Sequence, residues 1–459
     1  MEKYAILIHI SKGVNFFMKI CIINASPKGK YSVTLQTLLF LEKKFKGHAF
    51  EVLNVGQQIR VIEKDITGVV EKINAADLIV FSYPVYTFIA PSQLHRFIEL
   101  LKENNINLEG KFATQITTSK HFYDMTAHKY IEENCYDLKM KYIKGLSLDM
   151  EDLLNKNKQS EIIKFFDFVL SSVEKDIYEV IPNKNITIIP DYIPSNIMVE
   201  KKETYEVALV ADLREDDMNL KNMIDDFIKM FPYKVTVINI REFPFSGGCL
   251  GCFNCAGDGK CIYKDGFDSF LRDNIQTKAA IVIAFTIKDH SMGARFKMYD
   301  DRQFCNGHRT VTENMPFAYI VNGDYDSEHN LKTIVDARAE VGGNYLAGVG
   351  YNKETIIATS KKLEYALENK MTMPRNFYGV GGMKIFRDLI WIMRGIMKAD
   401  HEFYKKHGVY DFPQKQRGKM MLMCLLGSLV RNKKIKAKMG NKFNEGMVAP
   451  YKKIIDKME

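Results

Sequence analysis

Four of the eight cysteines lie within one glycine-rich stretch, GGCLGCFNCAGDGKC, at residues 247–261. They are Cys249, Cys252, Cys255 and Cys261, in the spacing Cys-x2-Cys-x2-Cys-x5-Cys. Such tight runs are typical of iron–sulfur ligands, because one bent segment must turn several thiolates toward one cluster. Structural zinc more often uses two cysteine pairs separated by a longer loop. The spacing therefore favours a four-iron four-sulfur cluster and leaves zinc, or unligated or disulfide-forming thiols, as alternatives.

The other four cysteines stand apart from this run. Cys21 lies in a strand pattern, Cys424 lies in an apolar run, and Cys135 and Cys305 are isolated. An isolated cysteine usually behaves as a small hydrophobic residue. We therefore expect these four to be buried and to bind no metal.

A second stretch, NASPKGKYSVT at residues 24–34, lies between a buried strand pattern and a helix pattern. Small and hydroxyl residues at such a junction let backbone amides and a helix N-terminus surround a phosphate. The stretch lacks the glycine patterns of dinucleotide folds and of nucleoside triphosphatases. It predicts a mononucleotide phosphate site, with an ordinary strand-to-helix turn as the alternative. The candidate contacts are Ser26, Pro27, Lys28, Gly29, Lys30, Ser32 and Thr34.

Two later loops are predicted to lie at the same edge of the sheet. The third strand pattern ends in SYPVYTFIAPSQLHRF and the fourth in TTSKHFYD. Ligands of doubly wound sheets bind beyond the carboxyl ends of the strands, where the strand order reverses. An aromatic side chain there can stack on a flavin ring. The candidate ring contacts are Pro84, Val85, Tyr86, Thr87, Thr117, Thr118 and Ser119.

These three loops, in this order, resemble the NADPH-dependent FMN reductase family of flavodoxin-like proteins. With its cysteine run, the second half resembles the iron–sulfur flavoproteins. The resemblance covers residues 18–370. It implies FMN, a cluster that passes single electrons, and redox chemistry with NAD(P)H, ferredoxin or a small acceptor.

The chain differs from the iron–sulfur flavoproteins because its phosphate loop and its cysteine run lie in different halves. The first half has the phosphate loop without the cysteines, and the second has the cysteines with the loop ADLREDDMNLKN. Asp212, Glu215, Asp216 and Asp217 in that loop would repel a phosphate monoester, which carries nearly two negative charges. We therefore expect FMN in the first domain and the cluster on the second.

Alternating short apolar runs and helical patterns predict the elements that position these residues. Such alternation is typical of a parallel, doubly wound α/β sheet with helices on both faces. The alternation occurs twice and predicts two flavodoxin-like domains, at residues 18–178 and 200–370, joined by a linker containing three prolines. A basic, Met-rich helical tail is predicted at 371–459, with a turn at YGVGG, residues 378–382.

The net charge of +9 is concentrated in this tail. Residues 371–459 hold 19 Lys and Arg against 7 Asp and Glu, which is +12. Basic amphipathic helices can lie on an anionic membrane surface, pack on the protein, or cover a pocket. The tail contains no recognisable catalytic residues, and the sequence leaves these roles open.

The chain as a whole is predicted to be a flavin- and iron–sulfur-dependent oxidoreductase. The alternatives are an NAD(P)H-dependent quinone or FMN reductase with zinc, and a non-catalytic electron carrier. We expect a small-molecule or protein redox partner and no nucleic acid, and we leave homo-oligomers open. The composition, 46% hydrophobic and 26% charged, is that of a globular protein. Because the sequence has no apolar run of about 20 residues, we expect a cytoplasmic protein. Since MKICIINASPKG, from Met18, is itself a natural beginning, we expect translation to start at Met18.

Overall fold

The computed structural model describes residues 17–182, 190–430 and 442–456. The prediction that translation starts at Met18 stays a prediction, because residues 1–16 lie outside the described residues. The chain divides into two compact units, one ending at His401 and one beginning at Glu402. The first unit contains two parallel sheets.

The first sheet has the strand order β2-β1-β3-β4-β5, with β6 also paired to β4. All of its strand pairs are parallel. Its strands are β1 (Lys19–Asn24), β2 (Ala49–Leu53), β3 (Leu78–Pro84), β4 (Phe112–Ser119), β5 (Lys141–Tyr142) and β6 (Leu146–Asp149). Its helices are α1 (Val33–Lys44), α2 (Val55–Ile62), α3 (Thr67–Ala75), α4 (Ser92–Glu103), α5 (Asp124–Asp137) and α6 (Lys156–Glu174).

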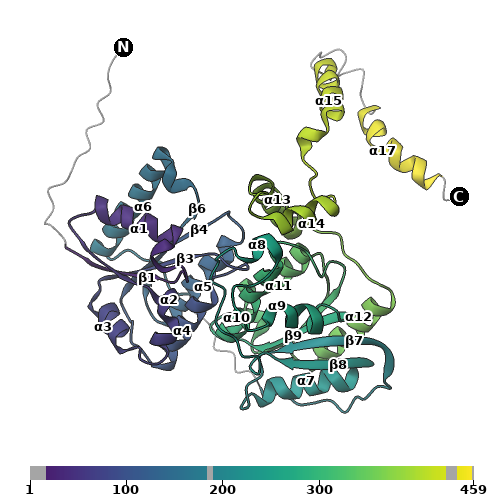
Figure 1. Ribbon diagram of the computed structural model, residues 1–459, viewed down its shortest axis with the longest axis horizontal. Helices are drawn as coiled ribbons and strands as arrows, with labels where there is room; N and C mark the ends of the chain where they lie inside the picture. The colour runs from purple at the N-terminus through teal and green to yellow at the C-terminus, as the bar shows by residue number, and fades with distance from the viewer. Residues whose placement is uncertain (1–16, 183–189, 431–441, 457–459) are drawn as a thin grey trace. The chain divides into compact units, whose positions relative to one another are not determined.

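The second sheet repeats this order, as β8-β7-β9-β10-β11. Its strands are β7 (Lys202–Ala211), β8 (Tyr233–Asn239), β9 (Ala280–Thr286), β10 (Pro316–Asn322) and β11 (Tyr345–Gly350). Its helices are α7 (Met218–Met230), α8 (Cys255–Asp258), α9 (Phe267–Phe270), α10 (Gly293–Arg302), α11 (His329–Gly342) and α12 (Lys353–Glu368). The order 2-1-3-4-5 is that of flavodoxin-like folds, so the predicted α/β fold class with two such domains is confirmed (Figure 1).

The two sheets share one hydrophobic core between them. Helix α4 packs on α10 and α5 packs on α11, and buried residues such as Phe97 of α4 and Phe296 of α10 belong to the same cluster. The outer faces have separate cores, under α1 and α6 in the first domain and under α7 and α12 in the second. Since α4 and α10 each follow the third strand of their domain, the halves pack as a pseudo-symmetric pair.

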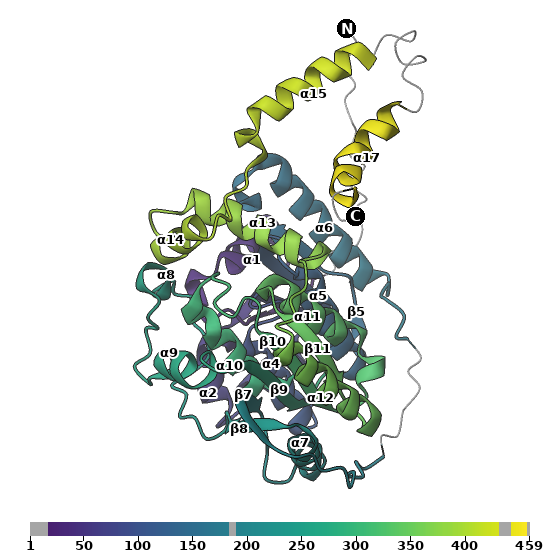
Figure 2. The ribbon, with the colours of Figure 1, turned by 90° about the vertical axis from the view of Figure 1, so that its right-hand side faces the viewer.

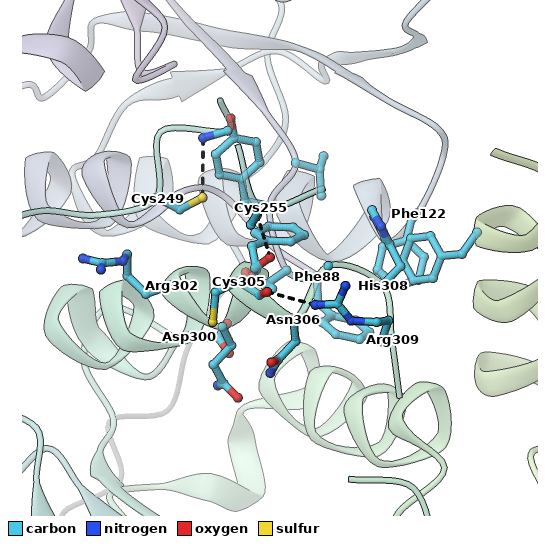
Figure 3. Close-up of a pocket in the computed structure, with 18 of the residues that line it drawn as sticks. Phe88, Phe122, Cys249, Cys255, Asp300, Arg302, Cys305, Asn306, His308 and Arg309 are labelled. Carbon is cyan, nitrogen blue, oxygen red and sulfur yellow. Dashed lines mark hydrogen bonds between the residues drawn. The ribbon is translucent and has the colours of Figure 1, made fainter. Parts of the chain in front are cut away.

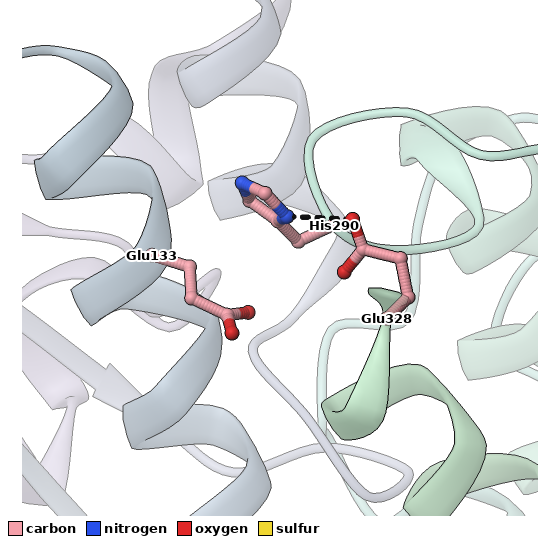
Figure 4. A group of neighbouring side chains, drawn as sticks. All are labelled: Glu133, His290 and Glu328. Carbon is pink, nitrogen blue, oxygen red and sulfur yellow. Dashed lines mark hydrogen bonds and ion pairs between the residues drawn. The ribbon is translucent and has the colours of Figure 1, made fainter. Parts of the chain in front are cut away.

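A histidine ion-pair cluster ties α5 to the second domain (Figure 4). His290 Nε2 lies 2.9 Å from Asp137 Oδ2, and His290 Nδ1 lies 2.8 Å from Glu328 Oε1. Burial lowers the pKa of His290, but its bonds to these two carboxylates outweigh burial and raise the pKa to about 9. Glu133, His290 and Glu328 lie close enough to share a metal ion. The two short contacts make His290 the centre of an interdomain ion-pair cluster.

Helix α13 (Phe377–Ile392) corrects the predicted turn at YGVGG, which lies in its first turns. It packs against α11 (Figure 2). A Cβ on Gly379 would come 2.5 Å from the Glu340 carbonyl oxygen, and one on Gly382 would come 2.8 Å from the Phe122 ring. The glycines therefore allow two elements to approach closely and do not bend the chain.

The described tail continues with α14 (Lys398–Lys406), α15 (Arg417–Val430) and α17 (Lys442–Ile455), which bears out a helical C-terminal region. Within the part of the chain that is described, no helix combines the length and apolar character needed to cross a membrane. Cys21, Cys135 and Cys305 are buried as expected, whereas Cys424 of α15 is exposed. That expectation was wrong because the apolar run around Cys424 does not pack into a core. The domain boundaries at 178, 200 and 370 stay predictions.

Candidate cofactor site

One cavity of about 420 Å³ lies at the carboxyl ends of the first sheet's strands and is lined by both domains. All four cysteines of the 247–261 loop line it, together with ten of the fourteen residues predicted to contact the cofactor. These ten are Ser26, Lys28, Ser32, Thr34, Pro84, Val85, Tyr86, Thr87, Thr118 and Ser119. Figure 3 shows Cys249 and Cys255 toward one end of the cavity and Phe122 with His308 toward the other.

Four predicted contacts lie away from the cavity lining, namely Pro27, Gly29, Lys30 and Thr117. The Lys30 side chain is exposed and lies over the Tyr31 ring, 5.2 Å from its centroid. Thr117 Oγ1 lies 2.8 Å from His128 Nε2, inside the first domain. Strand alternation explains Thr117, because neighbouring residues of a strand point to opposite faces.

The predicted phosphate loop joins β1 to α1. Ser32 is the N-cap of α1, and its Oγ accepts a hydrogen bond from Leu35 N at 3.3 Å. Thr34 Oγ1 lies 2.6 Å from Thr118 Oγ1, so the first and third predicted loops meet there. Ser26, Ser32, Thr34 and Thr118 are all buried. Neutral hydroxyls beside the N-terminus of a 12-residue helix form a suitable environment for a phosphate.

The matching place in the second domain is filled by a carboxylate of the chain itself. Asp217 is the N-cap of α7, and its Oδ1 accepts hydrogen bonds from Leu220 N at 3.2 Å and Asn322 Nδ2 at 3.3 Å. Thr286 at the end of β9 donates to the other carboxylate oxygen. The helix N-terminus is thus already paired with an anion, which leaves no equivalent place for a phosphate group.

The cysteine loop of the second domain rests on the first domain. Gln93 Nε2 donates to the Cys249 carbonyl at 3.2 Å, and Arg60 donates to the Ser246 carbonyl. Lys28 lies over the Phe253 ring, 5.1 Å from its centroid. Two predicted motifs more than 200 residues apart therefore meet in space.

Tyr86 and Gly251 bring the predicted flavin loop and the cysteine loop close together. Gly251 has a φ of +59°, and a Cβ on it would lie 1.9 Å from Tyr86 Oη. A side chain in this left-handed region costs about 1–2 kcal/mol. We expect Gly251→Ala to lower the free energy of unfolding by at least about 1 kcal/mol, measured by denaturant titration.

Gly257 provides the matched control for this substitution. It lies in α8 of the same loop, and among the described residues no atom comes within 4 Å of a Cβ placed on it. Alanine is favoured over glycine in a helix, so Gly257→Ala should leave the unfolding midpoint unchanged or slightly raised. Equal losses for both variants would contradict a specific contact at Gly251.

Arg302 is a site residue that the sequence analysis missed. Its guanidinium makes two hydrogen bonds to Asp265, at 2.9 and 2.7 Å, and a third to the Gly247 carbonyl at 2.8 Å. It therefore joins Gly247, two residues before the first cysteine, to Asp265, four residues after the last. An arginine 37 positions from its carboxylate partner gives no local sequence signal.

Burial shapes the chemistry of the cysteines. It raises the pKa of Cys255 to about 11, with the neighbouring Cys252 adding to the effect, and it raises the pKa of Cys249 further. Gly251 N donates to Cys249 Sγ at 3.4 Å. Thiols in such a place lose their protons only to a strong cation. The four cysteines of one loop, facing one cavity, fit as a ligand set for a metal centre.

An aromatic wall at the other end of the cavity was also missed. The Phe122 ring lies 5.0 Å from Phe88 and 4.4 Å from Phe386 of α13, measured between centroids. His308 lies 4.5 Å from Phe386, and its Nδ1 is 3.3 Å from Oδ2 of the buried Asp400. Helix α13 and Asp400 therefore help to enclose the cavity. Phe386 stands nearly 300 positions from Phe88, and no spacing rule connects them.

The comparisons with known proteins agree with this architecture. Residues 18–149 match the family model of the NADPH-dependent FMN reductases, which confirms the predicted resemblance for that segment. An iron–sulfur flavoprotein of Clostridioides difficile (strain 630) is 25% identical over 141 residues, 28% of this chain. This chain spans only 61% of the length of that relative.

Solved structures that are similar to part of this chain include two oxidoreductases. The NAD(P)H:quinone oxidoreductase from Methanothermobacter marburgensis is 14% identical, with a TM-score of 0.28, over 36% of this chain and 98% of its own. An FMN-dependent NADH-azoreductase from Bacillus anthracis, in complex with FMN, is 16% identical, with a TM-score of 0.26, over 35% of this chain and 99% of its own. The flavodoxin-like fold of each domain follows from the strand order and does not depend on these scores.

Proposed function

We propose that this protein is a flavin- and iron–sulfur-dependent oxidoreductase that moves electrons between NAD(P)H, or a reduced carrier, and a small-molecule or protein acceptor. FMN binds to the first domain and a four-iron four-sulfur cluster to the second. The observation that carries the proposal is the single cavity lined by the phosphate loop, the Tyr86 loop and all four cysteines. The match of residues 18–149 to FMN reductases supports the flavin, and the iron–sulfur flavoprotein relative supports the cluster.

The bound cofactors would supply the redox chemistry, a two-electron carrier beside a one-electron carrier, while the chain binds and orients them. Ser26, Ser32 and Thr34, with the N-terminus of α1, would hold the FMN phosphate. Tyr86 and Thr87 would lie along the flavin ring. Tyr86 also lies close to Gly251, so it would help to hold the flavin while touching the loop that would hold the cluster.

The cysteine geometry supports a cluster over zinc. A tetrahedral zinc with Zn–S bonds of about 2.3 Å brings its four sulfurs within about 4 Å of one another. Among the described residues, only Glu133, His290 and Glu328 form a group of three ligand atoms within 4.8 Å, and no set of three cysteine sulfurs does so. The sulfurs are thus not gathered at zinc-ligand distances, and the Cys-x2-Cys-x2-Cys spacing is what favours the cluster.

One anaerobic preparation separates this function from its alternatives. The proposed protein contains flavin and about four irons per chain, with brown absorbance added to the yellow flavin spectrum, and it oxidises NADH or NADPH. Stoichiometric zinc without iron would favour the quinone or FMN reductase. Both cofactors without oxidation of either nucleotide would favour an electron carrier.

We further propose that the C-terminal unit binds anionic membranes peripherally. Residues 402–459 contain 14 Lys and Arg against 5 Asp and Glu, so they carry the whole net charge of +9. Helix α15 exposes an apolar group beside these charges, namely Met420, Met421, Leu422, Met423, Leu425 and Leu426. Apolar insertion combined with basic residues is how peripheral helices bind anionic lipid.

Vesicle sedimentation tests this role. Full-length protein should bind vesicles of anionic phospholipid at low salt and lose most of that binding at about 0.5 M salt, because screening removes the attraction. A chain ending at residue 401 should bind neither these vesicles nor neutral ones. Full-length protein that ignores anionic vesicles at low salt would leave packing as the tail's role.

A further inference from the structure

The tight turn at residues 86–89 holds two residues in an unfavourable backbone conformation. Tyr86 N donates to the Ile89 carbonyl at 2.8 Å, and Ile89 N donates to the Tyr86 carbonyl at 3.1 Å. Between them Thr87 has a φ of +40° and Phe88 a φ of +71°. Left-handed conformations suit Gly, Asn or Asp, and they are strained for β-branched or bulky residues. Such strain persists only where the surroundings fix the backbone.

A buried ion pair on α10 of the second domain fixes this turn. Lys297 Nζ donates to the Tyr86 carbonyl at 3.0 Å, to Thr87 Oγ1 at 2.7 Å, and to Asp301. Thr87 Oγ1 also donates to Asp301, whose other oxygen accepts Ser92 N at 2.8 Å. The Lys297 and Asp301 side chains are both 0% exposed. Lys297 thus directs all three of its N–H donors to the turn and its carboxylate partner.

The second domain contains a counterpart of the turn that the Lys297–Asp301 pair (here called the clamp) holds in the first domain. The counterpart turn at 288–291 has the same paired backbone bonds, with positive φ at Asp289 and His290. Glu99 of α4 accepts Ala294 N at 2.7 Å, just as Asp301 accepts Ser92 N. A carboxylate of α10 therefore caps the N-terminus of α4, and a carboxylate of α4 caps the N-terminus of α10.

The two turns differ in the residues that they hold. Asp and His enter the left-handed region far more readily than Thr and Phe do. The position matching Lys297 is His95, because each lies four residues before the carboxylate that caps the other helix, Asp301 or Glu99. Burial, with the charge of Lys297, lowers the pKa of His95 well below its usual value, so it is neutral. Of the two turns, the one at 86–89 combines a strained backbone with the Lys297 ammonium group, and this is the turn that lines the cavity.

We propose that the Lys297–Asp301 pair of the second domain positions the Tyr86–Thr87 segment of the first domain for flavin binding. This inference rests on the proposed function, namely FMN in the first domain. In the second domain, Asp217 occupies the position where a phosphate would bind. That domain would instead contribute to the FMN site of the first domain through Lys297 and Asp301. Lys297 and Asp301 are positioning residues, because they act through Tyr86 and Thr87.

FMN titration of flavin-free protein tests the clamp. Lys297→Met keeps an unbranched side chain of similar bulk and removes the three donors. We expect FMN to bind about tenfold more weakly or worse, a loss of about 1.4 kcal/mol or more, with the iron content unchanged. Adding Thr87→Gly to Lys297→Met should recover part of the affinity, since glycine adopts positive φ without strain. A purely structural role for Lys297 would not produce this rescue.

Lys102→Met is the matched control. Lys102 of α4 lies 2.9 Å from Asp289 in the counterpart turn, across the same interface, and it does not line the cavity. Its loss should leave FMN affinity within about twofold of the wild type, well under 1.4 kcal/mol. Equal affinity of Lys297→Met and the wild type, or equal weakening by Lys102→Met, overturns the inference.

Hydrogen exchange separates the clamp from the flavin assignment. In flavin-free protein, the Ile89 amide should exchange faster in Lys297→Met, and in the second variant Asp301→Asn, than in the wild type or Lys102→Met. Unchanged exchange in a folded variant overturns the clamp even if flavin binds. Wild-type protein that takes up no FMN overturns the proposed function, and accelerated exchange would then leave the clamp as a feature of the fold alone.

Discussion

Ser26→Asp is expected to expel FMN and to leave the iron in place. Ser26 is 1% exposed and lines the cavity at the predicted phosphate loop. A new carboxylate there would face a phosphate monoester with nearly two negative charges. Two unit charges 4 Å apart repel by about 4 kcal/mol at an effective dielectric of 20, which corresponds to roughly a thousandfold loss of affinity. Flavin released on denaturation and iron per chain measure the two outcomes.

Lys30→Gln is the control for this prediction. It changes the net charge by one unit in the same loop, as Ser26→Asp does, but Lys30 is exposed and does not line the cavity. The long-range attraction that this substitution removes is screened over about 10 Å in ordinary buffer, so flavin content should stay close to that of the wild type. Loss of iron together with flavin in Ser26→Asp would show that the loop supports the whole fold, and the phosphate assignment would then lose its support.

The fold could be predicted largely because its information is local. Strands such as Leu78–Pro84 and Ala280–Thr286 are continuous apolar runs, as expected for parallel strands buried on both faces. Helix α5, in contrast, was not predicted. Its buried face contains Ala127, Tyr130 and Ile131, but the polar Thr126 and Asn134 lie among them and weaken the apolar pattern.

The site was predictable only where one segment of chain supplies several groups. The cysteine loop and the phosphate loop each carry a dense local pattern. Arg302, Phe386 and Asp400 reach the cavity from elements that only tertiary packing brings there. The YGVGG segment shows the converse error, because its glycines serve helix packing at Glu340 and Phe122, and sequence alone cannot tell a close approach from a turn.

Cys252→Ala is expected to remove most of about four irons per chain and to spare the flavin. Cys252 is an exposed member of the four-cysteine loop and lines the cavity. A cluster deprived of one of its four thiolates loses a bond that no nearby backbone group replaces. Flavin should remain, because the phosphate loop and Tyr86 belong to the other domain.

Two other cysteines make this test specific to the ligand set. Cys424 is also exposed but lies in the C-terminal unit, so Cys424→Ala should keep all of the iron. Cys305 lines the same cavity as the four, but it lies 44 positions after Cys261 and outside their loop. Cys305→Ala should therefore retain iron. Iron lost from Cys305→Ala but kept in Cys252→Ala would make Cys305 the ligand in place of Cys252, and stoichiometric zinc in the wild type would replace the cluster altogether.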